Sequence, residues 1–224
     1  MNREEVRTNL VMAGAAIGAL VAGAVVIRAT GRPLLGSLDA TIFLALNGGT
    51  VNPFFDATMP VVSIWELFYV ATTLIAGILF LKKEWRRGLL FLLFFGTSLA
   101  IATPVKRLAH LDRPYVSLNA ARTYDSAAEQ YVTGGHSRDV SANSSFPSSH
   151  AWLAFYFAGF FLWTGWPGWL SLALASLITF SRIYLGVHYP SDLLVGALWG
   201  MLFGKIAASM QSLKLKVQSS TVQA

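Results

Sequence analysis

Cysteine is absent from this sequence of 224 residues, and charged residues are scarce. Without cysteine the chain has no disulfides, no thiolate nucleophile and no cysteine-ligated zinc or iron–sulfur site. Only 12% of the residues are charged and 54% are hydrophobic, whereas about a quarter of the residues in soluble domains are charged. This composition argues against an ordinary soluble globular protein and favours a chain embedded in lipid.

Nucleic-acid binding is also disfavoured, although basic residues outnumber acidic ones by 17 to 11. The basic residues are scattered along the chain, and no run of them is longer than a pair. Such a modest excess is more typical of membrane topology or of an anionic substrate than of a nucleic-acid partner. No segment indicates an obligate protein partner.

Long uncharged stretches predict six membrane-spanning helices, because a backbone in hydrocarbon must satisfy its own hydrogen bonds. The expected spans are Thr8 to Ile27, Val61 to Leu81, Gly88 to Val105, two spans between about Ser148 and Arg182 that break at Gly165, and Pro190 to about Met210. We interpret the first as a retained span and not as a removed signal peptide. The fold class expected is therefore all-α, a six-helix membrane bundle forming one domain over residues 1–224.

The remaining segments are too polar or too interrupted to span. Leu38 to Met59 predicts a short interfacial helix with a turn. Arg107 to Ser145 reads as a polar loop of unusual length, and its part from Tyr115 to Ser145 is either a lid over a site or a flexible connector. Residues 211–224 read as a cytoplasmic tail. Glu66, near the start of the second span, is either functional or simply in contact with headgroup water.

The distribution of basic residues predicts which way the bundle faces. Nine of the seventeen fall on the side that holds both termini: Arg3, Arg7, Lys82, Lys83, Arg86, Arg87, Lys205, Lys214 and Lys216. Three of the eight on the other side are assigned below to chemistry. The positive-inside rule then puts both termini in the cytoplasm of a multi-pass cell-membrane protein.

The same parity of spans gathers ionisable residues at the opposite, extracytoplasmic end. Spans three to six begin or end there with Lys106, His150, Arg182, His188 and Asp192. Any one of them alone would be an ordinary interface anchor. Together they form a cluster of cations, histidines and one acid.

This cluster suits phosphoryl transfer. Lys106, Arg113 and Arg182 supply donors that match phosphate oxygens, and the helix start at Ser148 and Ser149 would favour a bound anion. Asp192 is close enough in sequence to orient His188 as a nucleophile or base. His150 would then protonate the leaving oxygen.

Three motifs resemble the signature of the type 2 phosphatidic acid phosphatase superfamily, integral-membrane lipid phosphatases that share a site with vanadium haloperoxidases. They are Lys106, six residues, then Arg113-Pro114; Pro147-Ser148-Ser149-His150; and Ser181-Arg182, five residues, His188, three residues, Asp192. The resemblance implies a six-helix bundle in which His188 forms a phosphohistidine, Asp192 holds it and His150 protonates the leaving group. It further implies that Lys106, Arg113, Ser148 and Arg182 hold the phosphate oxygens, with no metal or cofactor. Ser149 stands where the family usually has glycine, and its hydroxyl would either help to bind phosphate or crowd it.

The leading hypothesis is a lipid phosphatase or diphosphatase acting at the extracytoplasmic face. Isoprenoid diphosphate carriers, phosphatidylglycerol phosphate, phosphatidate and phosphorylated glycolipids all remain possible substrates. A non-catalytic lipid-phosphate transporter or receptor is the alternative, and a vanadate-dependent oxidoreductase is a third reading that the membrane spans disfavour. His110 and His136 lie outside the motifs and read as surface, packing or loop residues.

Overall fold

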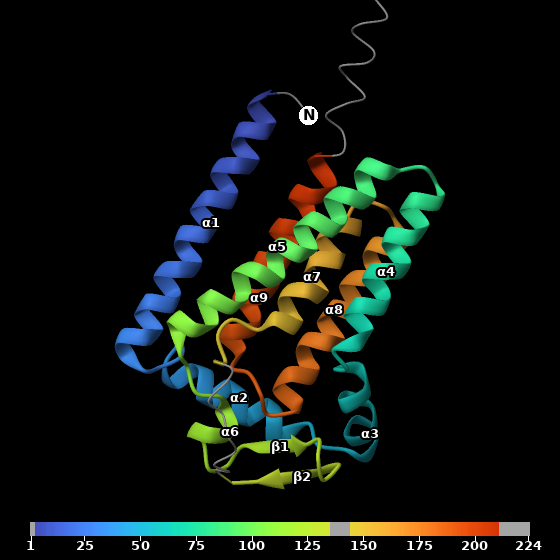
Figure 1. Ribbon diagram of the computed structural model, residues 1–224. Coiled ribbons are helices and arrows are strands. Elements are labelled where there is room, and N and C mark those ends of the chain that lie inside the picture. Colours follow the sequence, from blue (N-terminus) through green and yellow to red (C-terminus); the bar gives the residue numbers. More distant parts are fainter. Residues whose placement is uncertain (1–2, 135–143, 211–224) are drawn as a thin grey trace, which may run out of the picture.

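The computed structural model describes residues 3–134 and 144–210, and these residues form helices and one β-hairpin. In chain order the elements are α1 (Arg3–Thr30), α2 (Ser37–Gly49), α3 (Pro53–Val62), α4 (Glu66–Leu81), α5 (Trp85–Ala109), α6 (Pro114–Ser117), β1 (Arg122–Asp125), β2 (Gln130–Thr133), α7 (Ser149–Phe161), α8 (Trp166–Tyr184) and α9 (Pro190–Ser209). The long helices run side by side, and α2, α3, α6 and the hairpin gather at one end of them (Figure 1). The predicted tail 211–224 and His136 lie outside the described residues.

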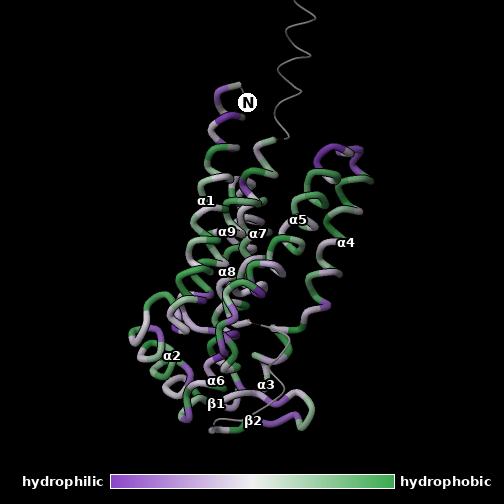
Figure 2. Tube along the Cα trace, turned by 60° about the vertical axis from the view of Figure 1, so that its left-hand side comes forward, coloured by the Kyte–Doolittle hydropathy of each residue, from purple (hydrophilic) through white to green (hydrophobic). Residues whose placement is uncertain are grey.

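Several of these helices are apolar enough to cross a membrane. In the described part of the chain, Arg7–Thr30, Trp85–Ser117 and Pro190–Ser209 have the length and hydropathy of spans. A fourth span results if α3 and α4 are taken together as one broken span. Figure 2 shows hydrophobic residues along the long helices and hydrophilic ones mainly at their connections and at the end with the hairpin. The prediction of a mostly helical chain with several apolar candidate spans is confirmed.

The second predicted span is wrong at its start. The sequence predicts one helix from Val61 to Leu81, but α3 ends at Val62, α4 begins at Glu66, and the two meet at 55°. Pro60 lies inside α3 and has no N–H to donate, so the helix is weakened there and stops within a turn. The predicted interfacial segment accordingly contains two helices, α2 and α3.

The predicted polar loop is also wrong in part, because it contains regular structure. After α6, β1 pairs antiparallel with β2, with Tyr124 opposite Tyr131. Asn47 of α2 holds this hairpin: its side chain exchanges hydrogen bonds with the backbone N–H and C=O of Arg122, and also donates to the carbonyls of Ile183 and Tyr184. The hairpin is thereby fixed to the end of α8.

A seam of close backbone contact joins α7 and α9. Gly196, Gly200 and Gly204 lie four residues apart on α9, and a Cβ atom on any of them would clash with a backbone oxygen of α7 or of Ser148 just before it. Each step of four residues along α9 moves the contact four residues along α7, so the two helices run parallel and begin at the same end of the bundle. Ser148 N–H donates to Asp192 C=O at 3.2 Å and closes the seam there.

Helix α1 packs much more loosely. The sequence suggests that Gly14 and Gly18 allow close packing, either within the bundle or against a second copy. In the structure no atom beyond the helix itself lies within 4 Å of a Cβ built at either position. The expected close packing within the bundle is therefore not found.

Candidate active site

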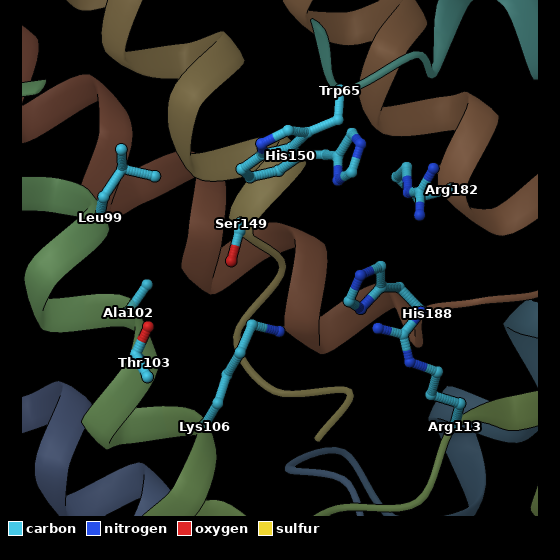
Figure 3. A pocket seen from close by; sticks show the side chains of 10 residues that line it. All are labelled: Trp65, Leu99, Ala102, Thr103, Lys106, Arg113, Ser149, His150, Arg182 and His188. Atoms are coloured by element: carbon cyan, nitrogen blue, oxygen red, sulfur yellow. The ribbon is translucent and has the colours of Figure 1, made fainter. Parts of the chain in front are cut away.

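A cavity of about 300 Å³ lies among the ends of α5, α7 and α8 and the segments that connect α3 to α4, α5 to α6 and α8 to α9. Figure 3 shows its lining: Trp65, Leu99, Ala102, Thr103, Lys106, Arg113, Ser149, His150, Arg182 and His188. Six of the eight site residues named from the sequence are among them. The structure thus brings together residues from α5, α7, α8 and two connecting segments that are far apart in sequence.

His188 lies between α8 and α9 and is almost fully buried. Its Nδ1 is 3.6 Å from Asp192 Oδ2 and 3.4 Å from Ser145 Oγ. The same Asp192 oxygen accepts hydrogen bonds from Ser145 Oγ and from Tyr189 N–H. Asp192 is fully buried and does not line the cavity, so its carboxylate approaches His188 from the side of the ring that faces away from the cavity. The nitrogen left to face the cavity is Nε2.

The environment of His188 keeps its imidazole neutral. Burial is the main cause, and the positive charges of Arg113, Lys106 and Arg182 add to it. Together they hold the pKa of His188 well below its usual value of 6.5. A neutral ring retains the lone pair that a nucleophile needs.

His150 lies at the start of α7, across the cavity from His188 (Figure 3). Its Nε2 is 3.1 Å from the backbone oxygen of Ser63, in the break between α3 and α4. Since a carbonyl only accepts, Nε2 carries a proton in this arrangement and Nδ1 is the other titrating atom. The rings of Trp65 and Phe68 pack edge-on against the imidazole, with centroids at 4.7 and 5.5 Å.

Three cations line the cavity. Lys106 Nζ donates to Ser144 C=O at 3.0 Å, which uses one of its three hydrogens. Arg182 Nη1 donates to Ser63 Oγ, while its Nε is buried and has no hydrogen-bond partner among the described residues. Arg113 approaches from the segment between α5 and α6, beside His188 (Figure 3). An anion bound here would meet positive charge from three directions.

The two serines before His150, both expected from the sequence near the phosphate, lie differently with respect to the cavity. Ser148 is expected to hold phosphate, but it is fully buried, caps α7 by accepting from Ala151 N–H and does not line the cavity. A residue at an N-cap uses its side-chain oxygen on the helix. Ser149 does line the cavity and turns its hydroxyl into it (Figure 3).

Sequence reasoning missed several polar residues that support the site. Ser63, Ser144 and Ser145 bind its charged side chains, and buried Asp39 of α2 accepts from both the backbone N–H and the hydroxyl of Ser191 at the start of α9. Ser63 lies apart from the motifs, whereas Ser144 and Ser145 stand just before the second motif but outside its pattern. Asp39 had a signal of its own, as an acid within an apolar stretch.

Two residues singled out from the sequence lie away from the cavity. Glu66 and His110 are exposed, and neither lines the cavity. Within residues 3–134 and 144–210, no three His, Asp or Glu side chains are grouped as metal ligands.

Comparisons with known proteins match this geometry. A family model described as the PAP2 superfamily covers residues 87–216, more than half of the chain. Lipid A 4'-phosphatase of Bacteroides thetaiotaomicron is 28% identical over 194 residues, covering 80% of this chain and 82% of that protein. The undecaprenyl-diphosphatase of Sulfolobus acidocaldarius is 25% identical over 147 residues, covering 64% and 65%. Two other curated relatives are about half identical to this chain, but the matches span only 32% and 30% of their length.

The fold is shared with a solved member of the same family. The crystal structure of a PAP2-type phosphatidylglycerolphosphate phosphatase from Bacillus subtilis superposes with a TM-score of 0.65 at 23% identity, covering 88% of this chain and 96% of that one. The family model includes all three motifs, from Lys106 to Asp192. The chain therefore belongs to the PAP2 superfamily.

Proposed function

We propose that this protein hydrolyses the phosphate monoester or diphosphate of a membrane lipid through a phosphohistidine intermediate. One observation carries the proposal: a buried, neutral imidazole and a second imidazole line the same cavity as three cations. Cations stabilise the charge that builds up on phosphoryl oxygens, and the imidazoles supply a nucleophile and an acid.

His188 is the nucleophile in this scheme. Asp192 and Ser145 lie at Nδ1, so Nε2 is the atom that attacks phosphorus. As the P–N bond forms, the bond from phosphorus to the leaving oxygen breaks and the ring becomes positively charged. The carboxylate of Asp192 stabilises that charge without touching the substrate.

His150 supplies the proton in the first step and recovers it in the second. The negative charge of a bound phosphate offsets the three cations, so His150 takes up a second proton and gives one to the leaving oxygen. A water molecule then attacks the phosphohistidine and loses its proton to His150. Inorganic phosphate departs, and both histidines return to their starting states.

Lys106, Arg113 and Arg182 bind the phosphoryl oxygens, together with the hydroxyl of Ser149. The partnerless Nε of Arg182 supports this assignment, since a buried donor without an acceptor costs free energy that a bound phosphate would recover. Ser148 contributes by capping α7, not by binding the substrate.

In the membrane we propose six spans: α1, α3 with α4, α5, α7, α8 and α9. We count α7 as a span because it packs along α9, and α8 because it packs along α7 in the same bundle. Both termini then lie in the cytoplasm, the cavity opens at the extracytoplasmic face of the cell membrane, and residues 1–224 form one domain. The apolar surface of the long helices supports this arrangement.

The decisive experiment is phosphate release by the purified protein from a panel of lipid phosphates in the presence of EDTA. His188→Ala is expected to lower the rate about a thousandfold or more, because the nucleophile is lost. His110→Ala is the matched control, since this histidine is exposed and does not line the cavity. Full activity of His188→Ala would refute the mechanism, and binding without turnover by the unaltered protein would favour a transporter or receptor.

A further inference from the structure

An apolar groove of about 480 Å³ lies between α4 and α8, with α7 contributing part of its wall. Helix α4 contributes Ala71 and Leu74, α7 contributes Ala154 and Phe157, and α8 contributes Ala175 and Ile178. Among all its lining residues, only Ser171 has a polar side chain. No charged group is available there to bind a headgroup, so the groove suits hydrocarbon alone.

The groove begins one helical turn from the catalytic cavity on α7 and α8, and it reaches the break between α3 and α4 through Val62 and Ile64. On α7, Ala154 follows His150 by four residues, and on α8, Ile178 precedes Arg182 by four. Residues three or four apart share one face of a helix and are separated along it by about 5 Å. On α7 and α8 the groove therefore continues the cavity along the bundle, away from Arg182 and His150.

Phe68 is the wall that the two spaces share. It lines the groove, and its ring packs edge-on against His150 in the cavity, with 5.5 Å between centroids. Its neighbour Trp65 lines the cavity itself, one turn nearer the start of α4. A molecule with an anionic end and a long apolar chain would fill both spaces at once.

We propose that the groove binds the hydrocarbon chain of the substrate while its phosphate occupies the cavity. This inference rests on the proposed lipid phosphatase function and specifies where the lipid lies. Along α7 the groove reaches from Ala154 to Phe161, a rise of about 10 Å, so it holds the first part of a long chain. The rest of the chain extends into the bilayer.

The groove should contribute little to the binding free energy of the substrate, and its effect should depend on the length of the substrate's hydrocarbon chain. A chain that enters the groove leaves other hydrocarbon behind, so no hydrophobic driving force operates and only packing contributes. Filling the groove should therefore weaken binding of long-chain substrates by a small factor and leave the chemistry of the cavity unchanged.

Two variants fill the groove from α4: Ala71→Phe at a half-buried position, and Leu74→Trp at an exposed one that the fold should tolerate. KM is measured for a dioleoyl lipid phosphate in mixed micelles and for water-soluble p-nitrophenyl phosphate. We expect KM for the lipid to rise about threefold or more while that for the soluble ester stays within about twofold. Thermal melting shows which variants are folded. If Ala71→Phe does not fold, Leu74→Trp decides the outcome.

A second apolar groove provides the matched control. It is about 250 Å³ in volume, lies between α1 and α9, and is lined by Ala16, which is half-buried like Ala71. Ala16→Phe should change neither KM. The proposal is overturned if the α4 variants raise both KM values equally, if they leave the lipid KM unchanged, or if Ala16→Phe has the same effect as they do.

A different result would identify a different path for the chain. The cavity also touches Leu99, Ala102 and Thr103 of α5, on its other side. If Ala102→Phe raises the lipid KM but not that of the soluble ester, while the α4 variants change neither, the hydrocarbon lies against α5 and the groove is not its site. Failure of the unaltered protein to release phosphate from any substrate would instead refute the proposed function.

Discussion

The seam between α7 and α9 and the polar end of the bundle are held together by different forces. In the seam, the glycines of α9 have no side chain, so the backbones of α7 and α9 come into direct contact. At the polar end, buried Asp39, Asn47, Ser145 and Asp192 connect segments through hydrogen bonds. The seam specifies a distance, whereas the polar end specifies which atoms meet.

The two regions depend on each other at one place. Because α7 and α9 run parallel, their starts lie together, and these starts carry His150 on one helix and Asp192 on the other. The bond from Ser148 N–H to Asp192 C=O lies at this junction. Packing deep in the bundle therefore sets the position of the candidate catalytic groups.

The largest effect is expected from breaking the seam. A Cβ at position 200 would clash with the backbone oxygen of Trp152, and backbone cannot move aside as a side chain can. Gly200→Ala should lower the free energy of unfolding by about 3 kcal/mol, seen as a lower melting temperature and poor yield. Gly14→Ala is the control, since the space there is open, and it should be neutral or slightly stabilising. Equal melting temperatures for both variants would mean that the seam is not tightly packed.

A smaller loss of stability is expected at the polar end. Asp39 accepts from Ser191 N–H, Ser191 Oγ and Leu35 N–H. In Asp39→Asn the amide N–H₂ would face one or more of these donors, so the unfolding free energy should fall by about 2 kcal/mol. Asp112→Asn, at an exposed aspartate, should stay within about 0.5 kcal/mol of the unaltered protein. The contrast is measured by thermal melting in one detergent.

The sequence predicted the long helices and the polar end to different degrees, and it gave no prediction of the seam. Spans are read from apolar length, and their parity places Lys106, His150, Arg182 and His188 at one end, as the cavity lining has them. The break after Val62 was missed because apolar residues continue across it. Mean hydropathy over a window of residues does not register how a single proline, Pro60, weakens the helix. Ser63 could not be found, since its role depends on a contact with Arg182, which lies 119 positions away.

Ser63 allows a test of the polar end through activity instead of stability. Its hydroxyl binds Arg182 Nη1 and Ser181 Oγ, and its carbonyl binds His150. Ser63→Ala removes only the hydroxyl, so Arg182 loses its support while His150 keeps its partner. KM for a lipid phosphate should rise about fivefold with little change in kcat, a loss near 1 kcal/mol.

The conservative variant Ser63→Thr keeps the hydroxyl and should largely restore KM. Steady-state kinetics on both variants distinguish the effect of the Ser63 hydroxyl on KM from any effect of the break between α3 and α4. A fall in kcat with unchanged KM would show that Ser63 acts through His150 and not through Arg182.

The smallest effect concerns the pH at which His188 loses activity. The attacking imidazole must be neutral, and burial among cations lowers its pKa, so the acid limb of kcat/KM should lie below the ordinary histidine value of about 6.5. Activity is then lost as pH falls through the lowered pKa, when His188 gains a proton. Ser145→Ala removes the hydroxyl that donates to Asp192 and frees this carboxylate to stabilise protonated His188. The acid limb should move toward higher pH by about half a unit, a differential interaction of about 0.7 kcal/mol.

The control for this shift is Ser176→Ala, an exposed position on α8 whose hydroxyl donates only to Leu172 C=O of its own helix. Its profile should coincide with that of the unaltered protein. If Ser145→Ala moves the limb toward lower pH, removal of the hydroxyl has weakened the Asp192 carboxylate as a partner of His188. If the limb does not move, Asp192 does not govern the ionisation of His188. In that case the hydrogen bonds at the polar end would set only the shape of the site, as the glycines of the seam do.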